Sequence, residues 1–379
     1  MTHTEEQFFE LLRAGLWDSK ARAELFTEAT DWNELFRLSK EQTLFAIIFD
    51  GVSSLPPAQR PPRAFLINWY AQLAYIEEKN RELNHLAAQL YQNYMEQGFT
   101  PVLLKGQGIA TCYRNPLHRN SGDIDWLIGE KDYVRANEWI QNLPNAHKDH
   151  ETSKHACYSI GEAEIENHRF ACIQYTPRDN RYFQQITEEW FPNGCDTVCI
   201  EHTNLRVPPA TYNALYILVH AIEHFITSGL GLRQLTDWVC LLHINHNKID
   251  TTRLLKHLKR LGLLKVWQTF GYIAVHTLGL PQEEIPFYNA GMQDKADIIL
   301  KRIFLTGNMG KNNKELKNRP KGYLGNKLFS LRYNVNHLLR LFRLFPGLAL
   351  KYSGYFLYIG IRQLWWDWSG NEKAVKSWE

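Results

Sequence analysis

The spacing of apolar residues changes twice along the chain, and this limits the folds that the sequence can adopt. Up to residue 98 apolar residues recur at helical intervals, which predicts a long helix over residues 63–97 with Gly98 as its C-terminal cap. Residues 99–175 carry short apolar or alternating runs, which are typical of strands. Helical spacing returns from residue 208. We therefore predict an α+β protein, in which a mixed sheet core lies between extensive helical N- and C-terminal parts.

Individual elements can be placed within this outline. Within residues 99–175 the sequence predicts helices at 108–114 and 131–143. It predicts strands at 100–105, 123–128, 155–160 and 163–170. Later helices are expected at 210–228, 231–246, 251–278 and 292–306, before an exposed loop at 307–325. We divide the chain accordingly into a helical N-terminal region (1–98), an α/β core (99–205), a helical domain (206–306) and a basic aromatic helical tail (307–379).

Composition and the first residues narrow the class of protein. The chain has 44% hydrophobic and 22% charged residues, as folded globular proteins do, which excludes intrinsic disorder. Its first residues lack the basic and apolar regions of a signal peptide, and its six cysteines form no C-x-x-C pair. We therefore expect free thiols and a cytoplasmic location. Because no uncharged apolar run reaches about 18 residues, we also expect no membrane-spanning helix.

The C-terminal tail is unusually basic and aromatic. From residue 301 to the end there are 15 Lys and Arg against 4 Asp and Glu, and residues 338–366 mix aromatic with basic side chains. Three interpretations stay open: a helical tail packed on the core, peripheral membrane contact, and nucleic-acid binding, which is the least favoured. The protein is therefore expected in the cytoplasm, either free or associated with a membrane surface.

Two aspartates stand out in the predicted strand at 123–128. Alternation along a strand places Asp123 and Asp125 on one face and turns the apolar residues between them to the other. Adjacent carboxylates repel unless a cation lies between them, and a pair of Mg²⁺ ions would suit these oxygen ligands. Upstream, Lys105 and Gly106 end one strand and open a helix, a position that favours phosphate binding. Arg119 could add a bidentate phosphate contact.

Two segments carry a resemblance to a known family, Leu103-Leu-Lys-Gly106 and Arg119-Asn-Ser-Gly-Asp-Ile-Asp-Trp-Leu-Ile128. They resemble the uncharacterised bacterial nucleotidyltransferase family of the polymerase-β-like superfamily, in which an apolar strand ending in Lys-Gly precedes a strand containing Asp-Ile-Asp. Further likeness lies in Ile165-Glu-Asn-His168, Leu218-Val-His-Ala-Ile-Glu-His224 and Leu232-Arg-Gln-Leu-Thr-Asp237. The resemblance covers residues 65–245, and the ordered set of motifs is specific although no single motif is.

The resemblance implies a sheet with antiparallel edges, flanking helices and Mg²⁺-dependent transfer of a nucleoside monophosphate from an NTP to a hydroxyl acceptor, with release of pyrophosphate. Two Mg²⁺ ions are implied, with Mn²⁺ as a substitute, and we expect ATP as the NTP; the acceptor is not identified. Asp123 and Asp125 match the metal-binding pair, and Glu166 matches the third carboxylate, which can also accept the proton of the acceptor. The predicted nucleotide- and phosphate-binding residues are Lys105, Gly106, Gln107, Arg119 and Ser121. Gln107 stands where the superfamily usually has Ser.

Several assignments around this site have rivals. Glu164 shares a strand face with Glu166, and we prefer Glu166 because it fits the Glu-x-His spacing of the family. His168, on the same face, is either a substrate contact or a histidine with a structural role. Arg233 and Asp237 are either substrate contacts or an ordinary surface ion pair four residues apart on a helix.

The segment from His220 to His224 suggests a different chemistry. Together with Glu223 it forms H-x-x-E-H, the zinc motif of inverted zincin peptidases, but the chain about 75 residues downstream offers no third ligand. We therefore interpret His220 and His224 as substrate contacts or packing residues and rank the zinc peptidase last. The second-ranked hypothesis, after the nucleotidyltransferase and before the peptidase, is a catalytically silent nucleotide-binding or assembly subunit.

Overall fold

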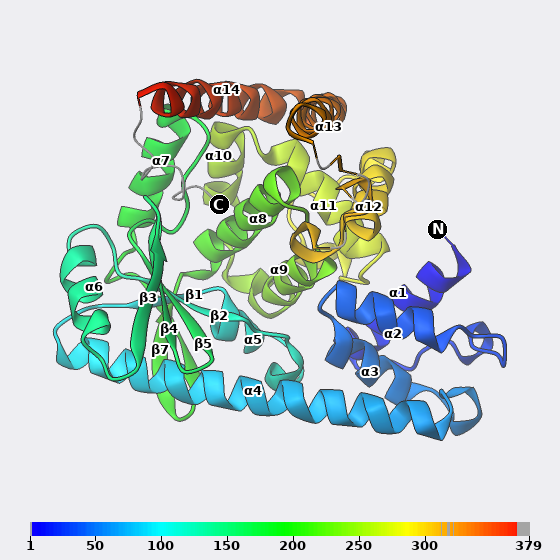
Figure 1. The fold of residues 1–379 in the computed structure, drawn as a ribbon. Helices are drawn as coiled ribbons and strands as arrows, with labels where there is room; N and C mark the ends of the chain where they lie inside the picture. Colours follow the sequence, from blue (N-terminus) through cyan, green and yellow to red (C-terminus); the bar gives the residue numbers. More distant parts are fainter. Residues whose placement is uncertain (1, 312, 317–318, 321, 370–379) are drawn as a thin grey trace.

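The computed structural model describes residues 2–311, 313–316, 319–320 and 322–369 (Figure 1). A five-stranded sheet lies at one side of the molecule and helices surround it. Its strands are β1 (Val102–Leu104), β2 (Asp123–Leu127), β3 (Ala146–Glu151), β4 (His155–Ile160) and β5 (Ala163–His168). A separate two-stranded sheet pairs β6 (Asp196–Ile200) with β7 (Thr203–Val207).

Fourteen helices are found in the described part of the chain, besides short 3₁₀ turns. The N-terminal ones are α1 (His3–Trp17), α2 (Trp32–Glu41), α3 (Phe45–Ser54) and α4 (Arg63–Glu96). Those near the sheet are α5 (Gly106–Ala110), α6 (Tyr133–Gln141) and α7 (Pro177–Glu188). The later ones are α8 (Ala210–Thr227), α9 (Leu232–Asn245), α10 (Thr251–Leu261), α11 (Leu264–His276), α12 (Gln293–Thr306), α13 (Tyr323–Leu344) and α14 (Pro346–Ser369).

The five-stranded sheet has the order β1-β2-β5-β4-β3 and is mixed. β2 and β5 run parallel, whereas β1 pairs antiparallel with β2, and β4 pairs antiparallel with both β5 and β3. The strands predicted at 155–160 and 163–170 are present as β4 and β5 and form a hairpin, in which Ile160 pairs with Ala163 across the turn at Gly161. The parallel pair joins two strands that lie about forty residues apart in sequence, and it places Asp125 directly opposite Glu166. The α+β class with a mixed sheet core is therefore confirmed.

Alternation along the central strands divides the sheet into a buried face and a polar face. Ile124, Trp126 and Ile165 are fully buried in an apolar cluster that also contains residues of α4 and α6. Burying such side chains stabilises a fold by about 1.5–3 kcal/mol each, so the register of β2 and β5 is strongly fixed. The acidic residues of the same strands consequently face the other way.

The long helix α4 connects the N-terminal helices with the sheet. Figure 1 shows it running beneath both, and a helix of 34 residues extends for about 50 Å. The helix predicted over 63–97 is thus confirmed. Gly98 follows α4 with a φ of +76°, the left-handed conformation expected after a helix. Asn80 of α4 donates hydrogen bonds to the carbonyls of Leu117 and Arg119 at 2.6 and 2.8 Å. The helix therefore also holds the loop that leads into β2.

Three parts of the sequence prediction need correction. The helix predicted at 251–278 is two helices, because Gly262 adopts a φ of +70° and ends α10. The strands β3, β6 and β7 and the helix α7 were not predicted. The loop predicted at 307–325 contains two 3₁₀ turns, Asn308–Gly310 and Lys314–Leu316, and the start of α13. The division at residues 98, 205 and 306 stays a prediction.

The C-terminal tail forms α13 and α14, which pack against one another where α13 ends. In the stretch predicted for membrane contact, 338–366, side chains are described up to Tyr358, so its last residues lie outside that description. Within the described residues, no helix combines the length and the apolar character that crossing a bilayer requires.

Candidate active site

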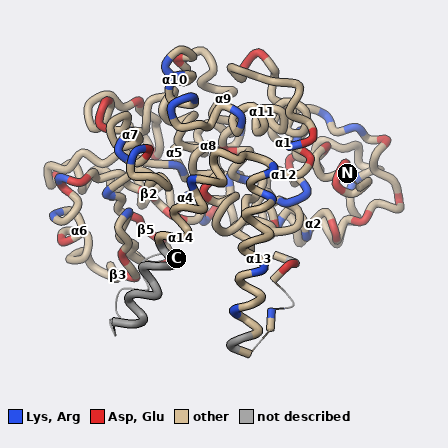
Figure 2. Tube along the Cα trace, turned by 90° about the horizontal axis from the view of Figure 1, so that it is seen from above, with Lys and Arg blue, Asp and Glu red and all other residues tan. Residues whose placement is uncertain are grey.

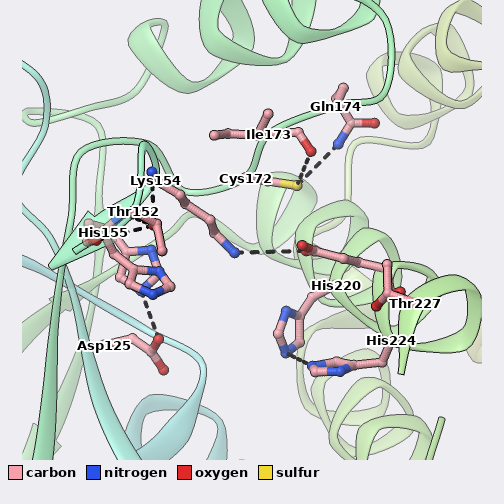
Figure 3. A network of polar contacts seen from close by, with 12 residues as sticks. Asp125, Thr152, Lys154, His155, Cys172, Ile173, Gln174, His220, His224 and Thr227 are labelled. Atoms are coloured by element: carbon pink, nitrogen blue, oxygen red, sulfur yellow. Dashed lines mark hydrogen bonds and ion pairs between the residues drawn. The ribbon is translucent and has the colours of Figure 1, made fainter. Parts of the chain in front are cut away.

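The polar face of the sheet opens onto a cavity of about 680 Å³. Its walls come from the β1–α5 junction, β2, β5, the β3–β4 turn, α8 and α9, with Tyr355 of α14 at one side. Figure 3 shows His220 and His224 of α8 facing Asp125 and His155 across the space into which Lys154 extends. The segments that enclose the cavity are far apart in sequence, so only the folded chain assembles it.

Three carboxylates form a cluster on the sheet wall. Asp123, Asp125 and Glu166 each offer an oxygen, and these three atoms lie within 4.8 Å of one another. Asp125 is fully buried, and its Oδ2 has no hydrogen-bond partner among the described residues. A buried carboxylate oxygen without a partner is costly unless a cation or donor reaches it. The donor set is all oxygen and fits a hard divalent cation such as Mg²⁺.

A lysine and a histidine flank this cluster. Asp125 Oδ1 forms an ion pair with Lys105 Nζ at 2.9 Å and lies 2.8 Å from His168 Nε2, which is also 2.9 Å from Glu166 Oε2. Burial opposes the charged form of Lys105, but Asp125, Asp123 and Glu166 outweigh burial and hold its pKa well above the usual value. Burial likewise opposes ionisation of Glu166, but His168 and Lys105 hold its pKa below the usual range. Glu166 is therefore ionised, as a metal ligand must be.

His168 has a structural position. It is fully buried, it does not line the cavity, and its Nε2 bridges Asp125 and Glu166. Of the two roles that the sequence left open, the geometry supports positioning of the carboxylates.

Glu164 does not group with the two aspartates, although one of its oxygens lies within 4.8 Å of ligand atoms of Cys157 and Glu166. It is exposed, and its Oε1 accepts a hydrogen bond from Cys157 Sγ at 3.1 Å. It lies opposite Asp123 in the register, whereas Glu166 lies opposite Asp125. Glu166, and not Glu164, groups with both aspartates, in agreement with the preference stated from the sequence.

The junction between β1 and α5 has an unusual backbone. Lys105 has a φ of +49° and Gly106 a φ of +42°, both in the left-handed region. A Cβ on Gly106 would lie 3.3 Å from the carbonyl oxygen of Asp123, so a larger residue would press on β2. Lys105 and Gly106, predicted from the sequence to bind phosphate, both line the cavity.

Gln107 and Ser121 do not line the cavity. Gln107 is buried, and neither atom of its amide has a hydrogen-bond partner in the described part of the chain. Ser121 Oγ accepts a hydrogen bond from Arg119 Nη1 at 3.0 Å. Direct phosphate contacts from these two residues are therefore not supported by the geometry.

Arg119 lines the cavity, but its bidentate fork is already used. Its Nε and Nη2 donate to the two oxygens of Asp237 at 2.7 and 2.8 Å, and Tyr113 Oη donates to the same carboxylate at 2.7 Å. Both charged side chains are buried. The predicted surface ion pair between Arg233 and Asp237 is thus wrong: Asp237 pairs in the interior with Arg119, which is 118 residues away in sequence.

Two further cations face the cavity. Arg233 donates one bond to the carbonyl of Asn120 at 3.3 Å, and its buried Nε has no hydrogen-bond partner among the described residues. Lys154 lies 3.8 Å from Glu223 Oε2 of α8. Sequence reasoning missed Lys154, and its signal was weak: a lysine in a turn before a strand is usually an ordinary surface residue.

His220 and His224 form a neutral pair on the opposite wall. Their Nε2 atoms lie 3.1 Å apart, and His224 Nδ1 lies 3.1 Å from Ser228 Oγ. Burial and the charge of Lys105 hold the pKa of His220 well below its usual value, and burial lowers that of His224 to about 4. Among the described residues, none of the clusters able to hold a metal includes either histidine. This arrangement does not support the zinc peptidase.

Residues 28–279 match the family described as "Uncharacterised nucleotidyltransferase". The match covers more than half of the chain and includes the three carboxylates, Lys105, Lys154 and the histidine pair. The chain belongs to this family. No match was found among curated proteins, and none among solved structures.

Family membership assigns the general activity. The protein is a nucleotidyltransferase, and an NTP is the substrate that the family implies. The cavity of this nucleotidyltransferase is built almost entirely from the matched range, with Met309 and Tyr355 as the exceptions. The tail helices α13 and α14 lie outside that range.

Proposed function

We propose that the protein transfers a nucleoside monophosphate from an NTP, with ATP expected, to the hydroxyl of an acceptor and releases pyrophosphate. The observation that carries this proposal is the grouping of Asp123, Asp125 and Glu166 on the wall of a large cavity. Such a set of carboxylates is what metal-assisted nucleotidyl transfer requires.

The three carboxylates would hold Mg²⁺, as two ions, or Mn²⁺ in its place. Bound Mg²⁺ supplies charge neutralisation at the phosphates and makes an acceptor hydroxyl easier to deprotonate. The all-oxygen donor set and the unpartnered Oδ2 of Asp125 support this assignment. Lys105 and His168 would keep Asp125 oriented.

Cations of the chain itself would bind the triphosphate. Lys105, Lys154 and Arg233 line the same cavity as the carboxylates. An NTP brings several negative charges, and charged N–H donors in a partly buried site bind phosphate oxygens strongly. The same three residues would stabilise the pyrophosphate as it leaves. Arg119, held by Asp237, contributes its positive charge to this wall but not a free fork.

The wall formed by α8 would receive the acceptor. His220 and His224 are neutral, and each imidazole carries both a donor and an acceptor nitrogen. They face Asp125 across the cavity (Figure 3). Neutral hydrogen-bonding groups on the wall opposite the carboxylates suit a hydroxyl-bearing molecule better than a second phosphate.

Glu166→Gln tests this function, with Glu164→Gln as a matched control on the same strand. We expect Glu166→Gln to leave NTP affinity within a few-fold of the parent and to lower turnover by about 10²–10⁴. Glu164→Gln should change turnover little, because Glu164 is exposed and does not group with Asp123 and Asp125.

Three other results would contradict the proposal, and each has its own interpretation. Equal losses of NTP binding and turnover in Glu166→Gln would make Glu166 a structural residue or a ligand of the ground state. Inactivation by Glu164→Gln alone would mean that the wrong carboxylate has been assigned. NTP binding without turnover in the parent would favour a catalytically silent nucleotide-binding subunit.

A further inference from the structure

Helix α13 carries a continuous apolar stripe on its outward face. Its members are between 40% and 67% exposed and are spaced three or four residues apart, namely Leu328, Leu331, Val335, Leu339 and Phe342. Five large apolar side chains at this spacing fall along one side of a helix. A contiguous exposed apolar face on a folded protein is typical of a surface that binds another protein or a membrane.

The inward face of α13 is attached to the body of the protein. Leu341 and Leu344 are buried, and Tyr333 Oη accepts hydrogen bonds from Arg302 and Asn313 at 3.1 and 2.9 Å. The helix therefore has a defined orientation. The apolar stripe faces away from the protein because the other side of the helix is already packed.

The charged residues of α13 itself are all basic. Residues 316–366 contain nine Lys and Arg and no Asp or Glu. The whole chain has a net charge of +3, so the remainder of the chain carries −6. Figure 2 shows α13 extending away from the rest of the molecule. Arg332 and Arg343 are both exposed next to the stripe.

We propose that the outward face of α13 docks on an anionic lipid membrane. The apolar stripe would enter the boundary between headgroups and acyl chains, while the flanking arginines would contact lipid phosphates. The helix would lie on the membrane, in line with the lack of a spanning helix among the described residues. This proposal does not depend on the reaction catalysed.

Two other occupants fit the surface less well. A second copy of the chain would bring Arg332 and Arg343 against the same basic residues, with no acidic residue on either helix to compensate. Nucleic acid would satisfy the arginines, but it would leave five apolar side chains against phosphates and water. An anionic bilayer matches the apolar stripe and the basic flanks together.

Docking through α13 would bring the cavity close to the membrane surface. α13 leads directly into α14 through Phe345, which is buried. Ten residues after Phe345, Tyr355 of α14 lines the cavity, and Leu350 and Leu357 of the same helix are exposed. The element that contacts the lipid is therefore continuous with a wall of the site.

Flotation of the full chain with vesicles tests the proposal. We expect binding to vesicles of phosphatidylcholine with phosphatidylglycerol, little binding to pure phosphatidylcholine, and release as ionic strength rises. Leu331→Gln with Leu339→Gln should weaken binding by about tenfold for each leucine. The matched control is Ile67→Gln with Ile244→Gln, which changes apolar residues of similar exposure, 61% and 55%, on α4 and α9 and should bind as the parent does.

A second pair of variants tests the charges. Arg332→Gln with Arg343→Gln should lower binding by about fivefold for each arginine and make it less dependent on salt. The proposal is overturned if the parent does not bind anionic vesicles, if the Ile67 and Ile244 variant loses as much binding as the Leu331 and Leu339 variant, or if the parent binds RNA or DNA and not vesicles. All variants change exposed side chains, and a circular dichroism spectrum like that of the parent confirms that they are folded.

Discussion

The buried ion pair of Arg119 and Asp237 gives the most quantitative prediction about stability. Asp237→Asn keeps the size of the side chain but removes its charge. Arg119, which is only 3% exposed, would then face an amide whose NH₂ group cannot accept its hydrogen bonds. Removing one partner of a buried pair costs about 3–5 kcal/mol, because the other charge stays buried without compensation.

This cost translates into a measurable change in Tm. A chain of 379 residues has an unfolding entropy of about 0.8 kcal/mol/K, so a loss of about 4 kcal/mol lowers Tm by about 5 °C. Tyr113 adds little to the loss, because its hydroxyl keeps a partner in Thr236 Oγ1 at 2.9 Å. Differential scanning calorimetry and urea unfolding should agree on the direction.

The control removes an exposed ion pair in the same way. Asp18 pairs with Arg114 at 2.5 Å, and both side chains are more than half exposed. Asp18→Asn should change the free energy of unfolding by less than about 1 kcal/mol, and asparagine tolerates the positive φ at this position. If Asp237→Asn costs no more than Asp18→Asn, Arg119 has another acceptor and the buried pair does not stabilise the fold as calculated.

Three further predictions concern pH, the backbone and the metal. His118 lies between Asp50 and Glu77 at 2.7 and 3.0 Å; burial opposes its charge, but the two carboxylates raise its pKa. The stability that protonated His118 adds is complete below about pH 6.5 and is lost as pH rises through the raised folded-state pKa. Urea unfolding over a pH series should therefore show a fall in the free energy of unfolding of the parent that His118→Gln lacks. Identical profiles would refute the assignment. Gly106→Ala should destabilise by about 1–2 kcal/mol in thermal unfolding because φ is +42°, and an unchanged Tm would contradict the strained junction. Removing divalent metal with EDTA should abolish turnover, and Mg²⁺ or Mn²⁺ should restore it; turnover that persists in EDTA would exclude the proposed metal site.

The sequence could predict the parts of the fold whose signal is local. α4, β2 and β5 were placed correctly because apolar residues alternate or recur at fixed intervals within each element. β3 was missed because its sequence, Ala146-His-Lys-Asp-His-Glu151, is polar and mostly exposed, so it has no apolar face to detect. The split between α10 and α11 depends on the backbone of one glycine, Gly262, inside an otherwise continuous helical pattern.

The candidate site was predictable in its carboxylates but not in its cations. Asp123 and Asp125 share a face by alternation alone, and Glu166 joins them through the parallel register of β2 and β5. Arg119 lies in the loop before β2 and pairs with Asp237 of α9 only in the folded chain, whereas spacing along the chain favoured Arg233 as the partner of Asp237. Lys154 lies in the turn between β3 and β4 and lines the cavity, and β3 was not predicted.

One measurement tests nucleotidyl transfer at Asp123 and Asp125 most directly. The parent and Asp123→Asn are incubated with Mg²⁺, an extract of small metabolites and an NTP labelled either at the α-phosphorus or at the γ-phosphorus. We expect the parent to place the α-label in a product that gains the mass of a nucleoside monophosphate, and the γ-label in pyrophosphate. Asp123→Asn should fold as the parent does and produce neither, since the substitution removes only charge. Transfer of the γ-label to the acceptor, or near-normal transfer of the α-label by Asp123→Asn, would contradict the proposed function.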